Sequence, residues 1–330
     1  MTQQDPTGVV TASHHVRLLA AGLRFPEGPV AMADASVLVC ELGGGQLTRV
    51  MPDGGKSVTA RLGGSPNGAA LGPDGRCYVC NSGGFSWFER DGLLMPGPPA
   101  AGQGAGSIQA VDLTNGTFET LYESAGDVLL RGPNDIVFDA DGGFWFTDHG
   151  KFQKRSRDRG SVFYALPNGS SIRECISGLE GPNGIGLSPD GSRLYVAETL
   201  TARLWSYDLA APGKLARNPT TFDGRRGTLI TGLGGYCLFD SLAMDVDGNI
   251  CVATLPGAVN VISPEGRLLD TLRCDDDFVT NICFGGPEND IAYVTLSSTG
   301  GLAVVEGFRK GLLLHFTGAH ASAPDAGHGP

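Results

Sequence analysis

The segment NGIGLSPDGSRLYVAET, from Asn183 to Thr199, decides the fold of this chain. It opens with a carboxamide side chain, continues as an apolar run, turns at Ser-Pro-Asp-Gly and returns as a second apolar run. Two β-prone runs joined by an Asp-Gly turn are typical of a β-hairpin, because these turn residues tolerate the backbone reversal. Asn183 is therefore expected directly before the first strand of a hairpin.

The same frame occurs five more times along the chain. These copies read EGPVAMADASVLVCEL from Glu27, NGAALGPDGRCYVCNS from Asn67, NDIVFDADGGFWFTDH from Asn134, DSLAMDVDGNICVAT from Asp240 and NICFGGPENDIAYVTL from Asn281. Further strand-like segments with Asp-Gly, Asn-Gly or Glu-Gly turns lie between the copies and supply a third and a fourth strand for each. Six copies of a four-stranded unit predict an all-β fold, a six-bladed β-propeller with four-stranded antiparallel blades.

The two ends of the chain indicate how the ring closes. We expect an N-terminal strand near 16–23 to pair with C-terminal strands within 302–316, because closure removes the exposed edges of an open sheet. The sequence thus predicts a single propeller domain over residues 14–318. Flexible tails are expected at 1–13 and 319–330.

Composition and charge exclude several classes of protein. The 51 Gly and 20 Pro among 330 residues leave little room for long helices. A formal net charge of −11 disfavours a nucleic-acid partner. No apolar run reaches the roughly 18 residues of a membrane span, and the N-terminus lacks a secretory signal. The eight cysteines are expected to be reduced, mostly buried thiols, which predicts a cytoplasmic protein.

The first residue of every copy is a carboxylate or a carboxamide. If each opens the innermost strand of its blade, all six meet at one mouth of the central channel. Close acids in a partly buried site need neutralisation, and Glu, Asp and Asn oxygens suit hard divalent cations. We therefore predict a central site for one divalent cation, with Ca²⁺ favoured and Mg²⁺, Mn²⁺ or Zn²⁺ as alternatives. Such residues also often bond only to the local backbone, and Asn67 and Asn281 are the members expected to be structural.

A second set of polar residues stands where each returning strand ends. Fourteen residues after the opening positions are Glu41, Asn81, Asp148, Thr254 and Thr295, and Glu198 follows the longer turn of the fourth copy. Because a hairpin brings its ends together, these residues are expected to orient those of the first set. The alternative is that they are merely solvated strand ends.

These motifs resemble those of the SMP-30/gluconolactonase/luciferin-regenerating-enzyme-like family. The resemblance rests on FPEGP around Glu27, PNDIVFDADGGFWFTD around Asn134, GPNGIGLSPDGSRLYVAET around Asn183, the Asp240-Ser241 pair and TNICFGGPENDIAYVT near the C-terminus, and it covers about residues 16–310. It implies a six-bladed propeller with a divalent metal in the channel and the activity of a lactonase or a phosphotriesterase. It also implies the metal ligands Glu27, Asn134, Asn183 and Asp240, with Asn134 binding metal or substrate.

The predicted function is metal-dependent, gluconolactonase-like hydrolysis of a lactone. The cation would polarise the carbonyl, and Asp240 would act as the general base or as the nucleophile. Asp148 is a reserve base. The residues expected to orient the ligands are Asp148, Glu198 and Ser241.

Substrate is expected to bind on the same face. Lactonases of the family often carry a substrate-binding Arg shortly before the Asn of the third block, and Arg131 stands three residues before Asn134. The long loop 82–107 carries Phe85 and Trp87 and is interpreted as a lid, or else as an insertion packing on a neighbouring blade or subunit. His149 opens a basic loop, 149–160, that either attracts an anionic substrate or is a solvated charge run.

Several alternatives remain open at this point. The same site could serve a phosphotriesterase or a strictosidine-synthase-like enzyme. The chain could also be a non-catalytic binding propeller that its metal stabilises. The expected partner is a small-molecule lactone or ester, with neither nucleic acid nor membrane, and the protein could be a monomer or a homo-oligomer.

Overall fold

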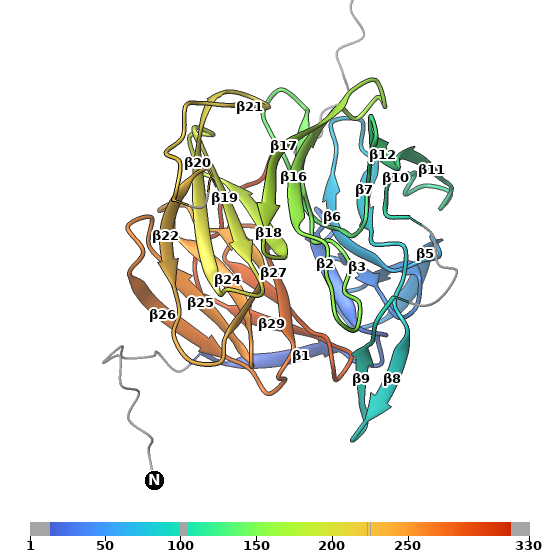
Figure 1. The fold of residues 1–330 in the computed structure, drawn as a ribbon. Coiled ribbons are helices and arrows are strands. Elements are labelled where there is room, and N and C mark those ends of the chain that lie inside the picture. Colours follow the sequence, from blue (N-terminus) through green and yellow to red (C-terminus); the bar gives the residue numbers. More distant parts are fainter. Residues whose placement is uncertain (1–13, 100–104, 223, 225, 318–330) are drawn as a thin grey trace, which may run out of the picture.

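The computed structural model describes residues 14–99, 105–222, 224 and 226–317, and it contains no helix in that part of the chain. Its strands form a six-bladed antiparallel β-propeller (Figure 1), which confirms the predicted fold class. The tails predicted at 1–13 and 319–330 lie outside the described residues. The search for membrane-spanning helices, made over the described residues, finds none.

Each of the first three blades follows one copy of the repeated frame. Blade 1 contains β2 (Pro26–Ala31), β3 (Val37–Glu41), β4 (Gln46–Val50) and β5 (Lys56–Arg61). Blade 2 contains β6 (Pro66–Leu71), β7 (Cys77–Asn81), β10 (Ser107–Val111) and β11 (Phe118–Tyr122). Blade 3 contains β14 (Pro133–Phe138), β15 (Phe144–Asp148), β16 (Gly160–Ala165) and β17 (Ile172–Leu179).

The other three blades continue the ring. Blade 4 contains β18 (Pro182–Leu187), β19 (Arg193–Glu198), β20 (Arg203–Ala211) and β22 (Thr228–Gly232), and the short β21 (Lys214–Leu215) also pairs with β20. Blade 5 contains β23 (Leu238–Met244), β24 (Ile250–Leu255), β25 (Ala258–Ile262) and β26 (Leu268–Arg273). Blade 6 contains β27 (Val279–Gly285), β28 (Ile291–Leu296), β29 (Gly301–Glu306) and the N-terminal β1 (Val16–Ala20).

The turns of the frame that contain an aspartate form as their chemistry predicts. In three of the hairpins a turn aspartate accepts a hydrogen bond at 3.1 Å from the backbone N–H two residues further on; these residues are Asp34, Asp74 and Asp190. Such a bond fixes the reversal within the turn itself. The inner hairpin of each of these blades is therefore encoded locally.

The ring closes by pairing of the two chain ends, as predicted. Strand β1 runs antiparallel to β29, with Val16 opposite Val305 and Arg17 opposite Val304. The expected C-terminal partner range was too long, because after β29 the chain leaves blade 6. Residues 311–317, called here the C-terminal strap, instead run from blade 5, where Leu312 N donates to Met244 O, to blade 3, where Phe316 packs on Phe138.

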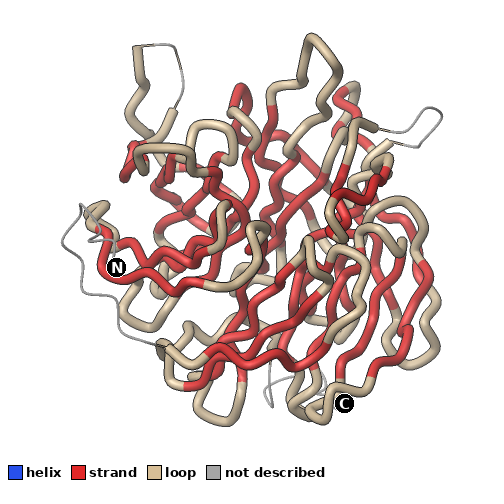
Figure 2. The backbone as a smooth tube through the Cα atoms, turned by 90° about the horizontal axis from the view of Figure 1, so that it is seen from below, coloured by secondary structure: helices blue, strands red, loops and turns tan. Residues whose placement is uncertain are grey.

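Apolar residues fill the space between neighbouring blades rather than one common centre. The buried side chains divide into six clusters, and each cluster joins two adjacent sheets of the ring. Figure 2 shows the sheets arranged around the axis of the molecule. All eight cysteines are free, and Cys40, Cys77, Cys80 and Cys251 are fully buried in these clusters or strands. The six innermost strands surround the axis itself.

Candidate active site

The six innermost strands, β2, β6, β14, β18, β23 and β27, lie side by side around the axis. The first residue of every sequence copy lies near the start of one of these strands, so the six residues gather at one mouth of the channel. These six residues, Glu27, Asn67, Asn134, Asn183, Asp240 and Asn281, are called the ring from here on. Five of these side chains are buried, whereas Asp240 remains partly exposed. The repeated frame therefore converges on one site.

Glycine follows the opening residue in three copies because the neighbouring backbone comes very close. A Cβ at Gly28 would lie 2.2 Å from the carbonyl oxygen of Asn67, and a Cβ at Gly68 would lie 2.4 Å from that of Asn134. Both distances are far inside van der Waals contact. These glycines let the inner strands approach one another at the level of the site.

Three buried or partly buried carboxyl groups of the inner strands influence one another electrostatically. Burial raises the pKa of Glu27 to about 7, although Asn281 Nδ2 and Gly28 N donate to its Oε2 at 3.0 and 3.1 Å. Burial and the neighbouring Glu27 hold the pKa of Asp240 well above its ordinary value. Burial also raises the pKa of Asp135 to about 7, and Glu27 adds to that rise. Among the described residues, no ion pair reaches any of the three.

Asp135 was not predicted from the sequence. It follows Asn134 directly, and its carboxylate accepts from Ile136 N at 2.9 Å and from Ile185 N of blade 4 at 3.4 Å. The prediction considered only the first residue of each copy. The available signal was an acid inside the apolar run NDIVF, at the position that is glycine in three other copies.

The four asparagines of the ring differ in the hydrogen bonds that their amide groups make. Asn183 Oδ1 accepts from Ser241 Oγ at 3.3 Å while its Nδ2 donates to Thr199 Oγ1 at 3.2 Å, so this amide is held in one orientation. Asn281 donates to Glu27 and accepts from Ile282 N, which occupies both ends of its amide. The Oδ1 atoms of Asn67 and Asn134 are buried without a hydrogen-bond partner.

These residues fit a divalent cation. Buried amide oxygens without a partner are rare and costly, and so are neighbouring carboxylates without a counter-charge. A hard cation would satisfy both, because it binds carboxylate and amide oxygens. No cluster of three His, Cys, Asp or Glu side chains with metal-binding potential occurs in the described part of the chain, so a cation here would depend on the amide oxygens as well.

The second set of polar residues holds the backbone that leads into the ring. Glu41 accepts from Arg24 N at 2.7 Å, Asn81 from Ser65 N at 3.0 Å and Glu198 from Glu180 N at 2.8 Å. Asp148 accepts from Arg131 N at 2.7 Å and from Gly132 N at 2.8 Å. In blades 1 to 4 these side chains fasten the segment two or three residues before the ring residue. They therefore hold the residues of the channel mouth in place through the backbone.

The loop that carries Phe85 and Trp87 crosses to neighbouring blades. It contains the hairpin β8 (Trp87–Arg90) and β9 (Leu93–Pro96), while a second small hairpin, β12 (Ser124–Ala125) and β13 (Val128–Leu129), follows β11. The rings of Phe85 and Trp87 lie 6.2 Å apart, and Trp87 packs 5.4 Å from Phe25 of blade 1. Leu94 N donates to Ser298 O of blade 6 at 3.1 Å. The β8–β9 hairpin therefore packs on blades 1 and 6.

Arg131 and His149 flank the entry to blades 3 and 4. Arg131 Nε lies 3.1 Å from Asp158 Oδ2, and its side chain is about half exposed. His149 covers the backbone before Asn183, since a Cβ at Gly181 would lie 2.8 Å from its Nε2. Burial lowers the pKa of His149 to about 4, so this imidazole is neutral at pH 7.

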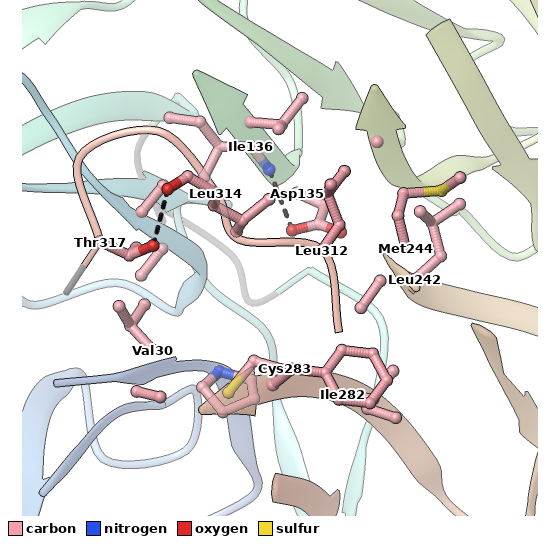
Figure 3. Close-up of a pocket in the computed structure, with 18 of the residues that line it drawn as sticks. Val30, Asp135, Ile136, Leu242, Met244, Ile282, Cys283, Leu312, Leu314 and Thr317 are labelled. Carbon is pink, nitrogen blue, oxygen red and sulfur yellow. Dashed lines mark hydrogen bonds between the residues drawn. The ribbon is translucent and has the colours of Figure 1, made fainter. Parts of the chain in front are cut away.

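Beyond the mouth, the channel is apolar and the C-terminal strap closes it. Figure 3 shows this cavity, of about 90 Å³, with Leu312, Leu314 and Thr317 of the strap on one side. Asp135 is the acid among its lining residues, and Val30, Ile136, Leu242 and Ile282 belong to its apolar wall. Polar chemistry is therefore concentrated at the mouth.

The chain is similar to proteins of one known family in sequence and to solved structures in fold. Residues 25–298 match the SMP-30/Gluconolactonase/LRE-like region. The chain is 29% identical over 265 residues to the lactonase drp35 of Staphylococcus haemolyticus, covering 78% of this chain and 71% of that protein. It is 25% identical over 301 residues to the gluconolactonase of Zymomonas mobilis, covering 84% and 78%. The crystal structure of the calcium-binding protein regucalcin from Agrobacterium tumefaciens superposes with a TM-score of 0.70 at 19% identity, covering 91% and 97%, which shows a shared fold.

Proposed function

Because the chain belongs to the SMP-30/gluconolactonase/LRE-like family, we propose that it is a divalent-metal-dependent hydrolase that opens a lactone. The observation that carries the proposal is the convergence of Glu27, Asn134, Asn183 and Asp240, from four blades, on one mouth where acids lack a counter-charge. The relatives named lactonase and gluconolactonase support this reaction, since the matches cover more than two thirds of each of them.

In this proposal Glu27, Asn134, Asn183 and Asp240 hold the cation. Ca²⁺ is favoured because all four donors are oxygen atoms, and the fold shared with a calcium-binding protein supports that choice. Mg²⁺, Mn²⁺ and Zn²⁺ are the alternatives. When bound, the cation supplies Lewis-acid polarisation of the lactone carbonyl and stabilises the negative charge that develops on its oxygen.

The protein's own groups then place the reactants and move the proton. Asn281 fixes the carboxylate of Glu27, and Ser241 with Thr199 fixes the amide of Asn183, so these ligand atoms are held before substrate binds. Asp240 is the partly exposed acid of the ring and can therefore meet substrate and water. As a general base, Asp240 takes a proton from the water that attacks the lactone carbonyl. The acyl C–O bond of the lactone then breaks, and the leaving alkoxide is protonated to give a hydroxy acid.

Asp240 could instead attack the acyl carbon itself. A single turnover in H₂¹⁸O separates the two routes. With Asp240 as nucleophile, a mixed anhydride forms, and ¹⁸O enters the Asp240 carboxylate when water attacks its Cγ. With Asp240 as base, the label appears in the product alone.

The test of the function combines metal analysis with hydrolysis assays. We expect the purified protein to contain about one divalent cation per chain and to release acid from lactones, with activity lost in EDTA and restored by Ca²⁺. Asp240→Asn should lower kcat by at least about a thousandfold while the circular dichroism spectrum is retained. Asp190→Asn, a solvent-exposed turn aspartate, is the matched control. Wild-type turnover by Asp240→Asn would refute the proposal.

The same panel distinguishes the alternative functions. Hydrolysis of a paraoxon-type ester without lactone hydrolysis would indicate a phosphotriesterase. A protein that binds the cation and gains thermal stability, but turns over neither class, would be a binding propeller.

A further inference from the structure

Lys151 is a partly buried cation in the loop that follows β15. Its Nζ donates to the backbone carbonyl oxygen of Ser82 and, at 3.5 Å, to that of Gly84, and it lies 5.2 Å from the centre of the Phe85 ring. No carboxylate among the described residues lies within ion-pair distance of this ammonium. Burial lowers the pKa of Lys151, although Asp148 and Asp158 favour its charged form from beyond ion-pair distance.

Lys151 borders a hollow of about 460 Å³ between the loops of blades 2 and 3. Its lining includes Gly84, Pro98, Arg131, Phe152 and Lys154. Arg131 is already paired with Asp158, whereas Lys151 and Lys154 have no acidic partner within 4 Å in the described part of the chain. The hollow is therefore cationic in a protein with a formal net charge of −11.

Two lining residues of the hollow, Arg131 and Lys151, are close along the chain to the residues of the channel mouth. Arg131 precedes Asn134 by three residues, and three residues of chain span at most about 11 Å. Asp148 fastens the backbone of Arg131 and Gly132, and Lys151 follows Asp148 by three residues as well. A substrate whose reacting carbonyl lies at the ring can thus extend a side arm into the hollow.

We propose that this hollow binds the carboxylate of a lactone substrate that carries an anionic arm, with the Lys151 ammonium as its counter-ion. The inference rests on the proposed function and names its substrate class. A carboxylate would add a charge-assisted hydrogen bond to an ammonium whose hydrogen-bond acceptors are the backbone carbonyls of Ser82 and Gly84. The cation–π contact with Phe85 orients Lys151 at the wall of the hollow.

The test compares two lactones that differ in charge alone. These are 3-(5-oxooxolan-2-yl)propanoate and its primary amide. We expect kcat/KM of the wild type to be about tenfold higher for the acid at low salt, and this ratio to fall as ionic strength rises. Lys151→Met should bring the ratio close to one, and Lys151→Arg should keep most of it. Lys214→Met, which removes an exposed lysine of β21, should leave the ratio unchanged.

Two results would overturn the inference. One is equal kcat/KM of the wild type for the acid and the amide. The other is a Lys151→Met variant that loses activity on both compounds equally and keeps their ratio, because Lys151 then serves only to join the two loops.

Failure of the proposed function would be recognised separately. If neither compound nor any other lactone is hydrolysed, calorimetric titration of the wild type with the intact acid and the intact amide measures binding to the hollow without turnover. If the enzyme is active, the same titration is made with the Asp240→Asn variant. Tighter binding of the acid that Lys151→Met abolishes supports the inference. Equal binding of acid and amide rejects it.

Discussion

His149 should make the protein less stable as the pH falls from 7 to 5. Burial holds the pKa of its imidazole at about 4, against 6.5 for an ordinary histidine; the Gly150 backbone favours the protonated ring, while Arg157 and Lys151 disfavour it. Between these two pKa values the unfolded chain binds the proton and the folded chain does not. The free energy of unfolding therefore falls with decreasing pH, and the linkage relation gives about 2 kcal/mol between pH 7 and 5.

The substitution His149→Gln isolates this contribution, because glutamine is neutral throughout that range. Urea unfolding of both proteins at pH 7, 6 and 5, with and without EDTA, gives the difference in unfolding free energy at each pH. Carboxyl groups of the ring titrate in both proteins, so their contribution cancels in the difference. We expect the wild type to lose about 2 kcal/mol relative to the variant. Parallel pH profiles would show that His149 is accessible to protons in the folded state and would refute the reasoning.

Three further substitutions test the ring, its supports and the strap. Asn281→Ala removes the donor to Glu27 and should weaken Ca²⁺ binding about tenfold by calorimetry; unchanged affinity would contradict the role given to Asn281. Asp148→Ala leaves three backbone N–H groups without their acceptor and should cost about 2–4 kcal/mol in urea unfolding, whereas a loss below about 1 kcal/mol would argue against it. Phe316→Ala should cost about 1–2 kcal/mol and speed maleimide labelling of Cys283, which lines the cavity under the strap; unchanged labelling would mean that the strap does not cover it.

The blades could be predicted from the sequence because each hairpin carries its own turn. Asp34, Asp74 and Asp190 fix their turns through local hydrogen bonds, so a short window of sequence contains the information. The β8–β9 hairpin was missed, although Asp91-Gly92 between WFER and LLMP is the same kind of signal inside a Gly- and Pro-rich loop. The C-terminal strap had no such signal, because its path depends on contacts with blades 3 and 5.

The site was predictable to the level of residue type and position, and no further. The position of each opening residue in the ring follows from the repeat, but the hydrogen-bond partners of each amide group do not. Asn134 and Asn281 open equivalent strands, yet one Oδ1 lacks a partner and the other accepts from Ile282 N. Each inner strand has a register shift near its start, and Asp135, which lines the cavity, lies within the shift of β14, between Pro133 and Ile136. Such shifts change which side chains face the axis and are not visible in an alternating pattern.

The six blades do not support their opening residues in the same way. In blades 1 to 4 the end of the second strand fastens the backbone before the ring residue, as Glu41 does for Arg24. In blade 5 the corresponding residue is Thr254, whose hydroxyl donates to Ala258 O instead. The segment before Asp240 consequently runs exposed over Gly234, Gly235 and Tyr236. In blade 6 Thr295 likewise bonds elsewhere, to Asn281 O, yet Asn281 is buried, so the partial exposure of Asp240 goes with the exposed approach of blade 5 and not with the missing acceptor alone.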